Sequence, residues 1–305
     1  MEKVGGENLY ISGMYALRGR EAIKRAGITH VVSVLRLSLD RELFVQYQHK
    51  IIEVDDVEDE NLLEQFPDSN RFISDALKGG GAVLIHCALG RSRSATVLAA
   101  YLMASRRLAP HLALGIIKRA RPFVEPNSGF MQQLELYHQM KFAVDVEDHP
   151  IYQRWMYLRD VERSNAAGRA PERIHFRDAE AEIGRITRVK EGETPEEKSE
   201  MQLRCKKCRT ALANSTSFTP HMPKPVQPSH NEAPRQPCAH HFVEPLLWMK
   251  TELSKGQISG KLECPKCRSK VGTYAWQGLK CSCGDWVVPG ISMARGKVDE
   301  VSLKL

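Results

Sequence analysis

The chain of 305 residues carries 44 Lys and Arg against 37 Asp and Glu, a formal net charge of +7. This length accommodates two domains and a connector, and no stretch approaches the roughly 18 consecutive apolar residues of a membrane-spanning helix. The first ten residues, MEKVGGENLY, lack the apolar segment of a secretory signal. We therefore expect no membrane partner and a reducing compartment, in which the eight cysteines act as metal ligands or as a nucleophile.

The positive charge is concentrated in the last third of the chain. Residues 1–150 hold 18 Lys and Arg against 19 Asp and Glu, residues 151–200 hold 10 against 11, and residues 201–305 hold 16 against 7. So basic a module is a candidate for contact with phosphate-rich surfaces, RNA above all. The alternative is that the charge serves solubility alone.

The first 145 residues alternate short strands and helices. Apolar, β-branched runs bounded by polar residues predict strands, at 28–35, 49–56 and 82–87. The spacing of apolar residues predicts helices, at 61–81, 93–104, 110–120 and 127–141. This alternation favours an α/β sandwich.

From residue 145 the sequence becomes highly charged and then rich in cysteine. The pattern of residues 151–171 predicts an amphipathic helix, residues 189–200 read as polar linker, and residues 222–237 form a proline-rich loop. No internal repeat is evident. The chain therefore divides into three predicted parts: a first domain (1–145), a charged helical connector (146–200) and a cysteine-rich module (201–305).

Cys87 stands far from the other seven cysteines, which all lie beyond residue 200. It ends a predicted strand, and five residues separate it from Arg93: Ala88, Leu89, Gly90, Arg91 and Ser92. A tight loop between a buried strand and a helix turns backbone N–H groups inward, and the helix N-terminus adds positive potential. Residues 88–92 are therefore a predicted phosphate-binding loop, in which Gly90 lets the backbone approach closely.

The residues around this loop suit nucleophilic chemistry on phosphorus. The field of the loop favours the thiolate of Cys87, and Arg93 can hold two phosphoryl oxygens in the transition state. Ser94 can donate a hydrogen bond to the thiolate as it leaves a phosphocysteine intermediate. A buried structural cysteine would not explain these neighbours. Arg91 either rims the pocket and favours acidic substrates or points into solvent.

The departing oxygen needs a proton from a carboxylic acid. Asp56 is the candidate, because it ends the predicted strand 49–56 on a nearby loop. Asp55 should alternate to the other face of that strand, and Asp59 lies further into the loop. His86 is expected to be a hydrogen-bonded strut for the phosphate-binding loop rather than a base.

The remaining cysteines have the spacing of metal ligands. Four thiolates form one predicted structural zinc site: Cys264, Cys267, Cys281 and Cys283. Cys205, Cys208 and Cys238 predict a second site that needs a fourth ligand. Spacing does not choose among the histidines of the module: His221, His230, His240 and His241. Zinc would supply much of the stability of so small a module.

The stretch from His86 to Ser94 resembles the signature of the cysteine-based dual-specificity protein phosphatases. Residues 121–137, RPFVEPNSGFMQQLELY, are similar to the stretch that follows the signature helix in that family, and the surroundings of Asp56 are similar to its general-acid loop. The resemblance implies a central, mostly parallel sheet flanked by helices. It also implies a phosphocysteine mechanism without a metal at the active site, acting on phosphotyrosine and phosphoserine/threonine in proteins.

The cysteine-rich module resembles the small, mostly β zinc domain of the dual-specificity phosphatase 12 (Yvh-type) family, in segments such as LRCKKCRTALA, CAHHFVEPLLWM and GTYAWQGLKCSCGDWVVPG. Carried over, the resemblance implies Cys205, Cys208, His221 and Cys238 as the ligands of the first of two zinc ions.

The family resemblance also implies a cellular role. Members act in the cytoplasm and nucleus on pre-60S ribosomal particles, where they promote exchange of an assembly factor during maturation of the large subunit. Two interpretations follow for this chain. It is either a phosphatase whose basic zinc module brings it to these particles, or a binding factor in which the phosphatase fold serves as a docking domain.

Overall fold

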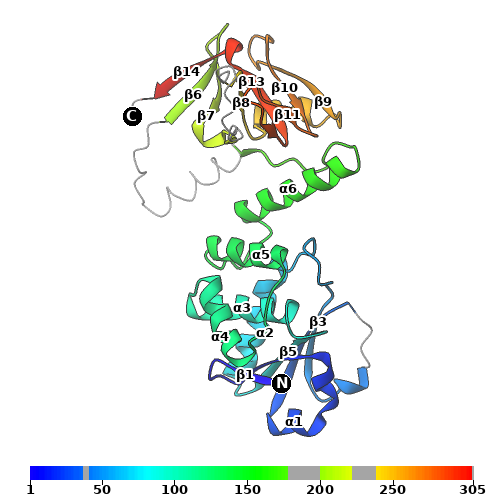
Figure 1. Ribbon diagram of the computed structural model, residues 1–305. Helices are drawn as coiled ribbons and strands as arrows, with labels where there is room; N and C mark the ends of the chain where they lie inside the picture. Colours follow the sequence, from blue (N-terminus) through cyan, green and yellow to red (C-terminus); the bar gives the residue numbers. More distant parts are fainter. Residues whose placement is uncertain (37–40, 178–199, 222–237, 304–305) are drawn as a thin grey trace, which may run out of the picture. The chain divides into compact units, whose positions relative to one another are not determined.

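The computed structural model of the chain describes residues 1–36, 41–177, 200–221 and 238–303 (Figure 1). These residues form two compact units, Met1–Tyr152 and Gln153–Leu305. The predicted proline-rich loop 222–237 and all but the last residue of the predicted linker 189–200 lie outside the described residues. Within the described residues, no helix combines the length and the apolar character needed to span a bilayer.

The first unit is built on a five-stranded sheet of order β1-β2-β5-β3-β4. Strand β1 pairs antiparallel with β2, and the other neighbours pair in parallel, so the expected mostly parallel sheet is confirmed. The central strand β5 is buried along its whole length. The strands are β1 (Glu2–Val4), β2 (Leu9–Gly13), β3 (Ile28–Val34), β4 (Gln48–Ile52) and β5 (Ala82–Cys87).

Helices cover both faces of this sheet. Helix α3 is buried from its first residue through Met103, and it packs against β5 together with α2. On the other face Leu17 and Ile23 pack against Leu84. The helices are α1 (Arg20–Arg25), α2 (Phe66–Lys78), α3 (Arg93–Arg106), α4 (Pro110–Ala120) and α5 (Ser128–Gln139), with short 3-10 helices η1 (Met14–Arg18), η2 (Arg41–Leu43) and η3 (Leu63–Gln65).

Two predicted elements are shorter than expected. The strand predicted over 49–56 ends at Ile52, because its partner β3 ends at Val34, so Asp56 lies in a loop. The helix predicted over 61–81 begins at Phe66, after η3.

The second unit is mostly β, as expected, with three small sheets of order β14-β6-β7, β8-β13-β10-β9 and β11-β12. Its strands are β6 (Glu200–Cys205), β7 (Ala211–Asn214), β8 (His240–Phe242), β9 (Ser259–Glu263), β10 (Lys270–Ala275), β11 (Leu279–Lys280), β12 (Trp286–Val287), β13 (Gly290–Ala294) and β14 (Val298–Leu303). Its short helices are η4 (Ser215–Ser217), η5 (Leu247–Met249), α8 (Lys250–Leu253) and η6 (Arg295–Lys297).

The core of the second unit combines strand residues with one face of a helix. Trp276, Tyr274 and Leu262 are almost completely buried in it. Helix α6 (Pro150–Ala166), predicted as an amphipathic helix over 151–171, contributes Tyr157 and Val161 to the same core. The helix thus buries its apolar face against the strands that carry the cysteines.

Candidate active site and metal-ligand clusters

Cys87 ends the central strand β5, and its side chain is 1% exposed. Two donors approach its sulfur: the backbone N–H of Gly90 and the hydroxyl of Ser94, each 3.2 Å from Sγ. Ser94 belongs to the first turn of α3, so the strand end, the loop and the helix start all converge on one atom. Such donors stabilise a thiolate, because they direct positive hydrogens at the negative sulfur.

The carbonyl oxygens of the loop 88–92 point away from Cys87. Each accepts a hydrogen bond from outside the loop: Ala88 from the N–H of Met14, Leu89 and Gly90 from the guanidinium of Arg121, Arg91 from the N–H of Glu125, and Ser92 from the N–H of Thr96. Because the C=O and N–H of one peptide unit point in opposite directions, this arrangement turns the amides of the loop toward the sulfur. The loop is thereby shaped as an anion-binding concavity.

Glycine is required at position 90 of this loop. Gly90 has φ of 71°, and a Cβ there would lie 2.5 Å from the carbonyl group of Ser12 in β2. Both the left-handed backbone and the close approach of β2 exclude a larger residue. We expected glycine at this position because the backbone must approach a neighbour closely. The close neighbour in the structure is the backbone of strand β2.

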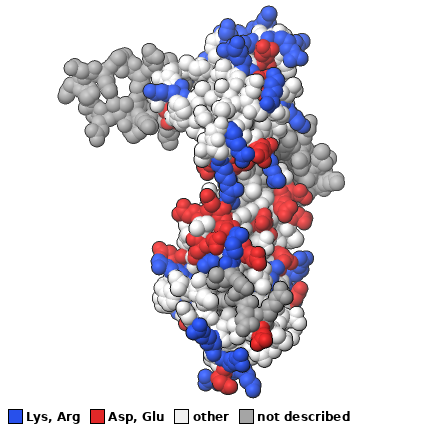
Figure 2. All heavy atoms as spheres, turned by 90° about the vertical axis from the view of Figure 1, so that its right-hand side faces the viewer, with Lys and Arg blue, Asp and Glu red and all other residues white. Residues whose placement is uncertain are grey.

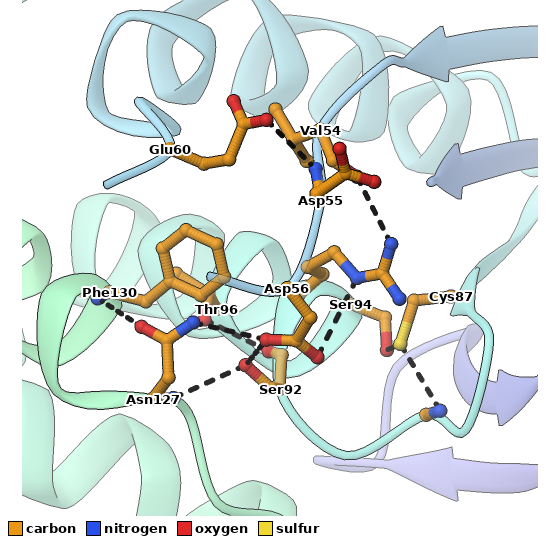
Figure 3. A network of polar contacts seen from close by, with 12 residues as sticks. Val54, Asp55, Asp56, Glu60, Cys87, Ser92, Ser94, Thr96, Asn127 and Phe130 are labelled. Carbon is orange, nitrogen blue, oxygen red and sulfur yellow. Dashed lines mark hydrogen bonds and ion pairs between the residues drawn. The ribbon is translucent and has the colours of Figure 1, made fainter. Parts of the chain in front are cut away.

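Arg93 lies beside Asp56 next to this loop, and Figure 3 shows Asp56 between Ser92 and Asn127. Arg93 is 9% exposed; its Nη1 donates to the carbonyl of Val54 at 3.0 Å, and its Nε lies 3.6 Å from Oδ2 of Asp56. The Ser92 hydroxyl and the Asn127 side-chain amide both donate to Oδ1 of Asp56, at 2.6 and 3.1 Å. The structure therefore brings the predicted nucleophile, arginine and acid into one site.

The loop that carries Asp56 is held by α5. Gln133, fully buried, accepts the N–H groups of Leu62 and Leu63 and donates to the carbonyl of Glu60. At the start of the same helix, Asn127 receives the N–H of Phe130 and holds Asp56. One helix thus fixes both ends of the loop.

The other candidates of the sequence lie away from this constellation. Asp55 pairs with Arg36, with 3.1 Å between Oδ2 and Nε. Arg91 is half-exposed and pairs with Glu125, so it neither enters the pocket nor stands as an unpaired cation at its rim.

His86 lies next to Cys87 but faces the opposite side of β5, since side chains alternate along a strand. It is fully buried, and its Nε2 lies 2.6 Å from the Ser33 hydroxyl, which lies 2.7 Å from Nε2 of His49. Phe44 stacks on His49 with ring centroids 3.8 Å apart. A hydroxyl can donate one hydrogen bond and accept another, so Ser33 can satisfy both rings while they are neutral.

Sequence reasoning assigned no role to several residues that build this site: Ser33, His49, Arg121, Asn127 and Gln133. The last three lie within the family-like stretch 121–137, which was the available signal. The other two are ordinary strand residues, and only the pairing of β3 with β4 and β5 brings them to His86.

All eight predicted metal ligands lie in two clusters. Cluster A consists of Cys205, Cys208, Cys264 and Cys267, and cluster B of His221, Cys238, Cys281 and Cys283; within each, the ligand atoms lie within 4.8 Å of one another. The prediction that Cys264, Cys267, Cys281 and Cys283 share one ion is therefore wrong, as is the grouping of Cys205, Cys208, His221 and Cys238. Each cluster can hold a metal ion.

The reason for the different grouping is the packing of hairpins. Cys205 and Cys208 lie at the turn between β6 and β7, and Cys264 and Cys267 at the turn between β9 and β10. Both hairpins pack in one core through Leu203 and Leu262, which brings their turns together. The Sγ atoms of Cys208 and Cys264 are 3.5 Å apart, and those of Cys205 and Cys267 3.7 Å. Tetrahedral zinc with bonds of about 2.3 Å would place sulfurs about 3.8 Å apart, so the cluster is compatible with zinc.

The two turns of cluster A have the same structure. Arg209 and Arg268, which follow the second cysteine of each pair, both adopt positive φ, of 63° and 58°. The next residue, Thr210 or Ser269, places its hydroxyl beside the sulfur of that second cysteine, at 3.2 and 3.0 Å. The segments LRCKKCRT and LECPKCRS are thus an internal repeat, which the expectation of no repeat missed.

Cluster B uses one of the four candidate histidines. Nε2 of His221 lies 3.2 Å from Sγ of Cys281 and 3.3 Å from Sγ of Cys238. His240 and His241 lie on β8 outside both clusters, and His230 lies outside the described residues. The ligands of cluster B pack around Phe242, apart from the core that holds cluster A.

The burial of His86 predicts an acid-sensitive contribution to stability. Desolvation lowers the pKa of its imidazole from 6.5 to about 4. The unfolded chain therefore binds a proton more readily between these values, and the free energy of unfolding should fall by about 2 kcal/mol between pH 7 and pH 5 on account of this residue. Denaturant unfolding at both pH values should show that His86→Gln removes this loss.

The exposed His111 offers a matched control for that measurement. His111→Gln should lose as much stability on acidification as the wild-type chain. An equal loss in His86→Gln and in the wild type would contradict the assignment.

Comparisons with known proteins agree with this geometry. The family of dual specificity phosphatase catalytic domains matches residues 9–140. Tyrosine-protein phosphatase yvh1 of Schizosaccharomyces pombe is 35% identical over 296 residues, which cover 97% of this chain and 83% of that protein. Tyrosine-protein phosphatase YVH1 of Saccharomyces cerevisiae is 35% identical over 316 residues, covering 91% and 85%. Dual specificity protein phosphatase 12 of Homo sapiens is 29% identical over 309 residues, covering 97% and 87%.

The similarity to these proteins extends over both units, and the catalytic-domain match contains Cys87, Arg93 and Asp56. The chain therefore belongs to the Yvh1-type family of dual specificity phosphatase 12 and is a dual-specificity protein phosphatase.

Proposed function

We propose that the chain hydrolyses phosphotyrosine and phosphoserine/threonine in proteins through a phosphocysteine intermediate. The observation that carries the proposal is the convergence of the Gly90 N–H and the Ser94 hydroxyl on Sγ of Cys87, within a loop whose carbonyls all point outward. This concavity suits both a thiolate and the phosphoryl group that it attacks.

In the first step the Cys87 thiolate forms a bond to phosphorus as the bond to the substrate oxygen breaks. The amides of residues 88–92 and the Arg93 guanidinium hold the remaining phosphoryl oxygens, while Asp56 gives its proton to the departing oxygen. In the second step water attacks phosphorus and the P–S bond breaks. Asp56 takes a proton from that water, and the Ser94 hydroxyl stabilises the departing thiolate.

Substituting Cys87→Ser should abolish turnover of an aryl phosphate, because a serine hydroxyl is not ionised at neutral pH. The measurement is kcat with p-nitrophenyl phosphate, with the zinc content of the same preparation as a check on folding. Asp56→Asn should lower kcat by roughly 100-fold or more, whereas Asp55→Asn, which changes a residue paired with Arg36, should not. Residual turnover in Cys87→Ser would contradict the mechanism.

We also propose that clusters A and B each bind one structural zinc ion. Support comes from the four ligand atoms of each cluster, which leave no open position of a tetrahedral site, and from the sulfur separations in cluster A. The role is stability, because these hairpins present short strands and a small core.

Double substitutions test the grouping of the ligands. Cys205→Ser with Cys264→Ser should remove one zinc ion per chain, because both residues belong to cluster A. Cys264→Ser with Cys281→Ser should remove both ions, because it affects both clusters. Zinc per chain, measured by plasma mass spectrometry, should follow this order, and the reverse order would favour the sequential grouping.

We further propose that the basic second unit binds pre-60S ribosomal particles in the cytoplasm and nucleus, where the protein promotes exchange of an assembly factor. Support comes from three exposed lysines at the turns of cluster A: Lys206, Lys207 and Lys266. The backbone N–H of Lys206 donates a hydrogen bond to the carbonyl of Lys297, which places Lys297 beside the same turn. Figure 2 shows Lys and Arg side chains gathered on this unit, at the top of the view. Such a surface favours phosphate backbones.

Two variants separate this role from catalysis. Cys264→Ser should reduce co-sedimentation with pre-60S particles and delay large-subunit maturation, since it disrupts cluster A. Cys87→Ser leaves that surface intact and should co-sediment normally. A maturation defect with Cys264→Ser alone would make the protein a binding factor whose phosphatase fold serves for docking, and a defect with Cys87→Ser alone would make catalysis its main task.

A further inference from the structure

The loop that carries Asp56 is strongly acidic. Six of the eight residues 53–60, here called the acidic loop, are Asp or Glu, and all six side chains are at least partly exposed. Arg36 pairs with Asp55 and Glu60, at 3.1 and 2.7 Å, and so offsets one of these charges. Figure 2 shows Asp and Glu side chains gathered on the face of the molecule that this view turns toward the reader. The loop therefore carries a large negative charge.

This charge lies at the edge of the phosphate-binding concavity. The carbonyl of Val54 accepts a hydrogen bond from Arg93, and Asp56 accepts one from Ser92. The Glu58 carboxylate accepts the hydroxyl of Ser128, the residue after the Asn127 that holds Asp56. A peptide with its phosphate at Arg93 must therefore pass close to these carboxylates.

The concavity itself retains a donor for that phosphate. Nε of Arg93 is buried and makes no hydrogen bond within the described residues. It lies 3.6 Å from Oδ2 of Asp56. This free donor indicates that the pocket binds an anionic group. The surface beside the pocket, in contrast, is negative.

The arginines on the other loops around the pocket do not offset this charge. Arg91 is paired with Glu125, and Arg121 with Glu2. The sequence had left open that Arg91 favours acidic substrates, but its pairing neutralises it. The charge beside the pocket that these ion pairs leave unbalanced is that of the acidic loop.

We propose that the acidic loop selects phosphoprotein segments in which Lys or Arg flanks the phosphorylated residue. The inference rests on the proposed phosphatase function and names the substrate class of that same site. Opposite charges speed encounter and lower KM, whereas acidic flanks add repulsion to that felt by the phosphate itself. The preference acts between exposed charges and weakens as salt screens them.

The test compares two phosphotyrosine peptides of equal length, one with Lys and Arg and one with Asp and Glu around the phosphotyrosine, on the full chain. We expect kcat/KM to be roughly tenfold higher for the basic peptide at low salt, with the ratio shrinking as salt rises. Glu58→Lys should lower the ratio of kcat/KM between the basic and the acidic peptide. Glu53→Lys should lower it as well, and Glu53 takes no part in the hydrogen bonds that hold Asp56.

Asp75→Lys is the matched control. It makes the same charge change near the end of α2 (Phe66–Lys78). The turn after α2 leads to Ala82, the first residue of β5, whereas Cys87 is the last residue of that strand. It should leave the ratio unchanged. Equal kcat/KM for the two peptides, with turnover of p-nitrophenyl phosphate intact, would overturn this inference alone. No turnover of p-nitrophenyl phosphate or of either peptide would overturn the proposed function and this inference with it.

Discussion

The interaction on which the first unit depends is the hydrogen bonding of the carbonyl oxygens of residues 88–92. The guanidinium of Arg121 donates hydrogen bonds to two successive carbonyls of this loop. The backbone N–H groups of Met14 and Glu125 donate to the carbonyls on either side. With every carbonyl satisfied outside, the amides can face Cys87 without leaving buried polar groups unpaired. The concavity is therefore built by residues that never reach the sulfur.

Asp56, the proposed acid, and Arg93 are also positioned by hydrogen bonds from other elements. Asp56 is placed by Ser92 from the loop and Asn127 from the start of α5, and Arg93 reaches the main chain beside it at Val54. Each side chain is oriented by a neighbour from a different element. The chemistry of the site thus depends on how β5, α3 and α5 pack, because no local stretch contains all of the contacts.

The second unit is a small domain with short strands, and its stability depends on how its hairpins are held together. Its two cysteine turns repeat one design, with an arginine at positive φ and a hydroxyl beside the second sulfur. Because each turn supplies two ligands, neither hairpin completes a tetrahedral site, and the hairpins must pack for cluster A to form. If cluster A binds zinc as proposed, the bound ion and the packing of the two hairpins stabilise each other.

The amino-acid sequence by itself determined what depends on local order: the strand 82–87, the helix from Arg93, the loop between them, and the eight residues with metal-binding chemistry. It missed β1, β2 and α1, whose short and irregular patterns carry little periodicity. Only the tertiary structure decided which cysteines share a cluster, that Arg91 is neutralised by Glu125, and that Ser33 joins His86 to His49. These contacts join residues 16 to 62 positions apart, and spacing along a chain does not specify which distant segments pack together.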